Sequence, residues 1–247
     1  MPLRPLALVV LLLAGFVARA EPPAPAPPAA PAPKLLGRIA DNRYHAPADI
    51  YSVAVPVLHG DAATILDNGE IVVFKDKIST LLTIAAFPLP PIAQFDYDTD
   101  GPREFLINFF RDNIVRDYRQ AFPDSSIESA RFLPDIFGGA LVAFTLLPGG
   151  SAFGPPEPVN PAAPPPVAKR GHFVFVRDGR IYVIAVELAE RVTQPAEYKL
   201  TTAEEDHILF DRLVTVTSAL RFGAMPAPAA GAQPAAADQP SPPVPAH

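Results

Sequence analysis

The chain has 247 residues, with 20 Lys and Arg against 26 Asp and Glu, which is a formal net charge of −6. Nucleic-acid binding depends mainly on cationic side chains that neutralise phosphates, so this balance argues against nucleic acid as the partner. The sequence has no cysteine, which excludes disulfides and a lipid attached to an N-terminal cysteine.

The first twenty residues predict a secretory signal peptide. Arg4 supplies the positive start, Leu6–Val17 the apolar stretch, and Ala18-Arg19-Ala20 a cleavage site of small residues. An uncleaved anchor is the alternative, although the apolar run is short for a membrane span. Cleavage would remove two arginines and no acid, which moves the formal charge from −6 to −8. We therefore expect a periplasmic or secreted protein with no stable membrane span after cleavage.

Proline divides the rest of the chain. Of the 33 prolines, seven lie in each of three alanine-rich segments: Glu21–Pro33, Pro155–Pro166 and Ala224–His247. Such segments have few bulky groups to bury and lack many backbone donors, so we expect them to be extended or disordered. The predicted organisation is a linker over 21–34, a single domain over 35–222 with a surface loop at 155–166, and a disordered tail over 223–247.

The N-terminal half of this domain predicts an antiparallel meander of about four strands. The candidate strands are Ile50–Leu58, Ala62–Leu66, Ile71–Phe74 and Ser79–Phe87. Asn68-Gly69 favours a tight hairpin turn, and Pro88–Pro91 cannot continue a sheet. Asn42–Ala48, which precedes the first strand, is interpreted as an irregular arm.

A helix is predicted over Pro102–Phe122. Its apolar residues recur at helical spacing: Ile107, Phe110, Ile114, Tyr118 and Ala121. Two further strands are predicted at Ser126–Leu133 and Ala140–Leu147.

The centre of the domain is predicted to be a hairpin. Phe173–Val176 and Ile181–Val186 flank Asp178-Gly179, which tolerates the positive φ angles of a tight turn. Neither run alternates between apolar and polar residues, so both faces need cover. Lys169-Arg170 is interpreted as a short basic step before this hairpin.

A closing helix is predicted over Ala203–Leu220. Thr202 and Glu205 match a capping box at its start. Its buried stripe is expected to be Leu209, Leu213, Val216 and Leu220.

This order of elements, with its ending Ser218-Ala219-Leu220-Arg221-Phe222, resembles the PsbP-like family of extracytoplasmic domains. The resemblance covers most of Asp41–Phe222. It implies an α+β fold with a central antiparallel sheet of about six to eight strands and helices packed on both faces. The family includes extrinsic photosystem proteins, a Ran-binding import factor and bacterial envelope proteins without assigned activity. It shares no active-site residues, so the resemblance implies none here.

Serine and histidine offer little support for catalysis. Ser151 lies in Gly149–Phe153, but Phe153 stands where a nucleophile elbow needs glycine, so a loop serine is expected. The five histidines show no metal-ligand spacing and are expected at the surface or at strand ends; they are His45, His59, His172, His207 and His247.

The stretch Asp96–Gly101 has a chemical interpretation. Asp96, Asp98 and Asp100 alternate before a glycine, as in the first half of an EF-hand calcium loop. Ile107 stands where the bidentate glutamate is needed, and Glu104 is a substitute ligand. The alternative is that these acids cap the helix beginning at Pro102.

We therefore expect a non-catalytic binding or accessory domain whose partner is a protein or small ligand of the cell envelope. One alternative is an envelope hydrolase assembled from scattered His, Asp and Ser residues. Another is a weak calcium-binding module. Calcium is the one cofactor that the sequence suggests.

Overall fold

The computed structural model describes residues 35–60, 63–153, 165–194 and 197–223. The predicted signal peptide (1–20) and linker (21–34) lie outside the described residues. So do residues 155–164 of the predicted proline-rich loop (155–166) and residues 224–247 of the tail. The predictions for these segments therefore stay predictions.

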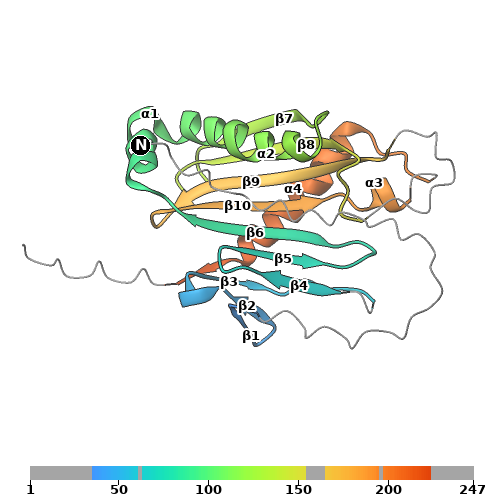
Figure 1. Cartoon of the computed structure of the whole chain (residues 1–247), viewed down its shortest axis with the longest axis horizontal. Helices are drawn as coiled ribbons and strands as arrows, with labels where there is room; N and C mark the ends of the chain where they lie inside the picture. Colours follow the sequence, from blue (N-terminus) through green and yellow to red (C-terminus); the bar gives the residue numbers. More distant parts are fainter. Residues whose placement is uncertain (1–34, 61–62, 154–164, 195–196, 224–247) are drawn as a thin grey trace, which may run out of the picture.

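The domain is built on a seven-stranded antiparallel sheet with the strand order β4-β5-β6-β10-β9-β8-β7 (Figure 1). Its strands are β4 (Thr64–Asp67), β5 (Ile71–Lys75), β6 (Leu81–Pro88), β7 (Ser126–Leu133), β8 (Ala140–Pro148), β9 (Val167–Arg177) and β10 (Arg180–Glu187). The α+β class and the antiparallel sheet of six to eight strands are confirmed.

The hairpin of β9 and β10 occupies the middle of this sheet, as predicted. Asp178 and Gly179 have φ angles of 50° and 65°, the positive values that a two-residue hairpin turn requires. Phe173 and Phe175 are buried on one face of the sheet, and Val174 is buried on the other. The continuous apolar run therefore reflects cover on both faces.

One face is covered by a long helical stretch, which comprises α1 (Pro91–Phe109), the π-helix η2 (Phe110–Val115) and α2 (Arg116–Ala121); the short α3 (Glu190–Thr193) lies on the same face. Gly101, with φ 82°, interrupts the helical geometry and divides α1 into two segments, the second of which begins at Pro102 as predicted. The first segment, Pro91–Asp100, was not predicted. Pro91 is a first-turn residue of that segment, a place where proline is tolerated because its missing N–H would have no partner within the helix.

The other face carries α4 (Thr202–Ala219) and a second, four-stranded sheet with the order β1-β2-β3-β11. Its elements are β1 (Arg38–Ala40), β2 (Arg43–His45), β3 (Tyr51–Ala54), β11 (Arg221–Phe222) and the short 3-10 helix η1 (Pro47–Asp49). The single four-strand meander predicted for the N-terminal half is therefore wrong, because β3 belongs to this second sheet. The predicted irregular arm contains β2. Strands of two to four residues are too short for an alternating pattern to be recognised.

The capping box of α4 is displaced by one residue from its predicted place. Thr201 is the N-cap and accepts a hydrogen bond from the Glu204 N–H, and the Glu204 side chain accepts from the Thr201 N–H. Two threonines precede two glutamates here, so the sequence allows both registers. In the observed register Glu205 is not part of the capping box, and its side chain is buried.

Aromatic rings join the two sheets. Phe175 stacks on Tyr182, with ring centroids 5.0 Å apart, and on Phe137, with centroids 4.3 Å apart. Phe222 of β11 meets the Tyr182 ring edge-on at 5.3 Å, and Tyr51 of β3 meets it at 6.1 Å. These contacts hold the small sheet against the main sheet.

We expect Phe175→Ala to lower the free energy of unfolding by about 3–5 kcal/mol, because it empties a fully buried site between two stacked rings. Denaturant titration measures the loss. A change below about 0.5 kcal/mol, the size of an ordinary surface effect, would contradict the central position of β9.

Candidate functional site

The helical face of the main sheet contains a chain of buried polar side chains. Glu187 of β10 accepts hydrogen bonds from Arg170 Nε at 2.9 Å and from Ser151 Oγ at 2.6 Å. The Ala152 N–H also donates to this carboxylate, and Arg170 in turn donates to the Gly150 carbonyl at 2.9 Å. This network secures the turn that follows β8.

His172 lies in the interior and not at the surface or a strand end, so that prediction is wrong. Its Nε2 is 2.9 Å from the Tyr118 hydroxyl, and its Nδ1 is 3.4 Å from the Ala143 carbonyl. Burial, together with the positive charge of Arg170, lowers the pKa of His172 to about 3. Ser151 and His172 thus bond to different partners, and the geometry does not join them as a nucleophile and its base.

The neutral His172 should make the protein sensitive to acid. Its pKa is depressed in the folded state, so below about pH 6.5 the unfolded chain binds a proton that the folded chain refuses. Stability from this group is complete above that pH and falls, by up to about 1.4 kcal/mol per pH unit, as the pH decreases toward 3.

Urea unfolding at a series of pH values tests this expectation. His172→Gln should flatten the loss of stability between pH 6.5 and 4.5, whereas His207→Gln, at an exposed position on α4, should not. Parallel curves for the wild type and His172→Gln would show that His172 does not contribute to the acid sensitivity.

Lys169 lies on the opposite face of β9 and is fully buried. Its Nζ is paired with Glu128 of β7 and with Glu205 and Asp206 of α4. Burial opposes the charged form, but these carboxylates outweigh it and raise the pKa of Lys169. Arg191 also pairs with Glu205. The interpretation of Lys169-Arg170 as a basic step before the strand is therefore wrong, because both residues are ion-pairing members of β9.

The acids of the calcium prediction lie on a helix and not in a loop. Asp96, Asp98 and Asp100 belong to the first segment of α1, and Glu104 follows the break at Gly101. Asp98 accepts a hydrogen bond from Gln94 Nε2 at 2.9 Å. Among the residues that the structure describes, no three His, Cys, Asp or Glu side chains are grouped as metal ligands would be.

Calcium binding by these acids stays a prediction, and thermal unfolding can test it. If Asp96, Asp98, Asp100 and Glu104 bind calcium in the millimolar range of extracellular modules, saturating calcium should raise the melting temperature. Asp98→Ala should abolish the rise, and EDTA should reverse it. An equal melting temperature with and without calcium would exclude the site.

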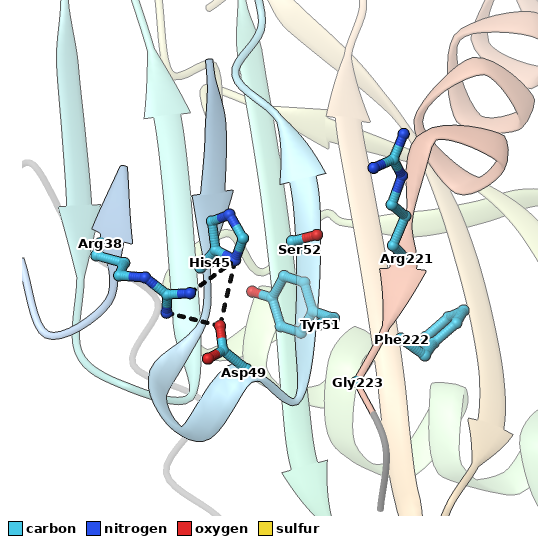
Figure 2. Close-up of a pocket in the computed structure, with 8 residues that line it drawn as sticks. All are labelled: Arg38, His45, Asp49, Tyr51, Ser52, Arg221, Phe222 and Gly223. Carbon is cyan, nitrogen blue, oxygen red and sulfur yellow. Dashed lines mark hydrogen bonds and ion pairs between the residues drawn. The ribbon is translucent and has the colours of Figure 1, made fainter. Parts of the chain in front are cut away.

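A pocket of about 240 Å³ lies on the small sheet beside η1 and β11 (Figure 2). Its lining residues are Arg38, His45, Asp49, Tyr51, Ser52, Arg221, Phe222 and Gly223. In the strand register Arg38 faces His45, His45 faces Ser52, and Ser52 faces Arg221. Directly opposed residues share one face of a sheet, so these four side chains form a row across all four strands. We call Arg38, His45, Ser52 and Arg221 the polar row.

A close backbone contact shapes one wall of the pocket. The Gly223 N–H donates to the Ile50 carbonyl at 3.1 Å, which seats the end of β11 against η1. A Cβ atom at Gly223 would lie 1.9 Å from the Asp49 carbonyl oxygen. Only glycine permits this approach.

Positive charge predominates in the pocket. Arg38 Nη1 pairs with Asp49 Oδ1 at 2.6 Å, and His45 Nδ1 lies 3.2 Å from the same oxygen (Figure 2). The hydrogen bond from Arg38 lowers the pKa of Asp49. Arg221, at the other end of the row, forms no ion pair with any residue in the described part of the chain.

A further arginine lies near Arg221. Arg43 donates to the Ser52 carbonyl at 3.0 Å and to the Ala219 carbonyl, at the end of α4, at 2.8 Å. Burial and the positive charge of Arg221 lower the pKa of Arg43. Arg43 and Arg221 are therefore close to each other. Asp49 is the one carboxylate among the lining residues of the pocket.

Sequence reasoning did not find this pocket. Its members come from segments more than 150 residues apart and follow no motif. From the sequence, His45 of the polar row is named as one of five histidines. Arg221 and Phe222 are named only as part of the ending Ser218–Phe222. The one feature of the sequence that points to this pocket is Arg221, an arginine directly after the closing helix.

No protein-family model and no curated protein matches the sequence. The solved structure of cyanobacterial PsbP (CyanoP) from Synechocystis sp. PCC 6803 is similar in fold, with 13% identity, a TM-score of 0.46, and coverage of 73% of this chain and 91% of that chain. The Ran-binding protein Mog1p of Saccharomyces cerevisiae has 8% identity and a TM-score of 0.41, with coverage of 73% of this chain and 94% of that chain. The fold resembles the PsbP-like structures. At these values the likeness concerns the fold alone.

A Bacteroides thetaiotaomicron protein is also similar, with 10% identity and a TM-score of 0.33 over 74% of this chain and 48% of that chain. Within the described residues, no helix combines the length and the apolar character needed to cross a membrane.

Proposed function

We propose that the chain is a non-catalytic binding or accessory domain, periplasmic or secreted, that recognises a carboxylate-bearing segment of a partner protein in the pocket of the small sheet. The observation that carries this proposal is the polar row, in which Arg221 has no acidic partner among the described residues. The expected signal peptide supports the location.

The polar row suits a carboxylate on an extended peptide. Arginine binds carboxylates through two parallel hydrogen bonds, and Ser52 adds a hydroxyl between the two arginines. Neighbouring strands lie about 4.8 Å apart, so the row extends about 14 Å, the length of about four extended residues. Phe222 is only partly buried and adds apolar surface to the lining, which favours an apolar side chain next to the acid, whereas Tyr51 is almost fully buried against Tyr182.

A peptide that carries phenylalanine between two aspartates is a suitable probe. Titration into the 15N-labelled protein should shift the amide signals of Ser52, Arg221 and Gly223, and the same peptide with lysine in place of aspartate should not. Arg221→Ala should weaken binding about tenfold, because one hydrogen bond to a charged group contributes about 1.5 kcal/mol.

Arg111→Ala is the matched control, since Arg111 is an exposed arginine on η2 that pairs with Asp112. It should leave the affinity unchanged. If both alanine variants weaken binding equally, the attraction comes from overall charge and the pocket has no specific role. If inorganic phosphate shifts the same signals and the peptide does not, the partner is not a protein carboxylate.

A further inference from the structure

The first segment of α1, Pro91–Asp100, presents an apolar ridge between carboxylates. Ile92 is 54% exposed and Phe95 is 64% exposed. Asp96, Asp98 and Asp100 are exposed as well, and none of them forms an ion pair with a described residue. Residues three apart are neighbours on a helix surface, so Ile92 and Phe95 form one exposed apolar patch.

Helical geometry places these side chains in a definite order. Ala93 and Tyr97 pack against the core under α1, so the opposite side of the segment faces solvent. At about 100° per residue, Phe95 lies at the centre of the outer side, with Asp98 on one flank and Ile92 and Asp96 on the other. The non-helical Gly101, with φ 82°, ends this segment. We call the segment Pro91–Asp100 the acidic ridge.

The acidic ridge matches the pocket of the small sheet in charge and roughly in size. Asp96 and Asp98 lie on opposite flanks of a helix about 10–12 Å wide, against about 14 Å for the polar row. Arg38 and Arg221 stand at the two ends of the row, and the pocket of about 240 Å³ includes Phe222 in its lining. Phe95 would enter this pocket while the flanking aspartates meet the two arginines.

We propose that a second copy of this chain occupies the pocket, and that it does so through its acidic ridge. The inference rests on the proposed function, because the acidic partner segment is then Pro91–Asp100 itself. Both complementary surfaces are present on one chain. The Arg38–Asp49 pair is exposed and therefore weak, so Arg38 can exchange Asp49 for an aspartate of the second copy.

The position of the two surfaces decides how copies would join. Figure 1 shows the start of α1 and the pair η1 and β11 toward the same end of the molecule, on the left of the view. They lie on opposite faces of the main sheet. A ridge on one face and a pocket on the other join copies head to tail, so a pair of copies keeps one free ridge and one free pocket and can add further copies. The net charge of −6 opposes association in general, so the contact depends on local attraction and weakens as salt is raised.

Sedimentation equilibrium over a range of protein concentrations tests the proposal. The wild type should change from monomer to dimers and longer head-to-tail assemblies, and Phe95→Asp should weaken the contact by about tenfold or more. Val57→Asp is the matched control, because Val57 is 75% exposed and lies outside both surfaces. It should associate like the wild type. A monomeric wild type at every concentration would overturn the proposal.

Charge exchange identifies the contact itself. Asp96→Lys with Asp98→Lys should prevent association, and so should Arg38→Glu with Arg221→Glu. The chain that carries all four substitutions should associate again, because the charges are restored with the signs reversed. If circular dichroism shows that this variant is folded and it stays monomeric, the ridge and the row are not partners.

The acidic peptide separates this inference from the proposed function. Peptide binding to a wild type that stays monomeric would defeat the self-association and leave the pocket function standing. Peptide that binds the wild type and Arg221→Ala equally would defeat the pocket function. If both proposals hold, the peptide should convert the assemblies to monomer, because peptide and ridge compete for one pocket.

Discussion

The structure depends on β9, a strand that is covered on both faces and yet carries three basic side chains, Lys169, Arg170 and His172, before the exposed Arg177 at its end. Lys169 points to one layer, and Arg170 and His172 point to the other. An unpaired charge in such a place would cost several kcal/mol, so each charge needs a partner. Glu205 of the covering helix α4 pairs with Lys169, and Glu187 of the neighbouring strand β10 pairs with Arg170. His172 stays neutral beside Tyr118 of α2. The positions of α4 and α2 on the sheet are therefore tied to the polar side chains of β9.

The small sheet depends on this arrangement in turn. Its inner face is held by aromatic contacts of Tyr51 and Phe222 with Tyr182, which leaves its outer face for polar residues. Because β11 follows α4 directly, the helix that neutralises Lys169 also delivers Arg221 to the edge of the sheet. The position of the candidate pocket is thus a consequence of the core.

The two surfaces of interest differ in charge and shape. The polar row lines a hollow and is rich in arginine, whereas the acidic ridge is a helix side with an exposed phenylalanine. The buried polar groups, by contrast, mostly bond to one another. This distribution agrees with the proposed binding function, because the two surfaces expose opposite charges on the described part of the chain.

The sequence by itself determined the α+β class, the central hairpin, the strands of the main sheet and the closing helix. These features follow from local causes: turn residues such as Asp178-Gly179 and apolar runs long enough to show a period. Only the tertiary structure decided that Lys169 and His172 are buried, because the local sequence is compatible with an exposed side chain as well as with a buried, paired one. It alone also assembled the polar row. Arg38, His45, Ser52 and Arg221 come from strands too short to show a pattern, and they meet only because long-range pairing sets their register.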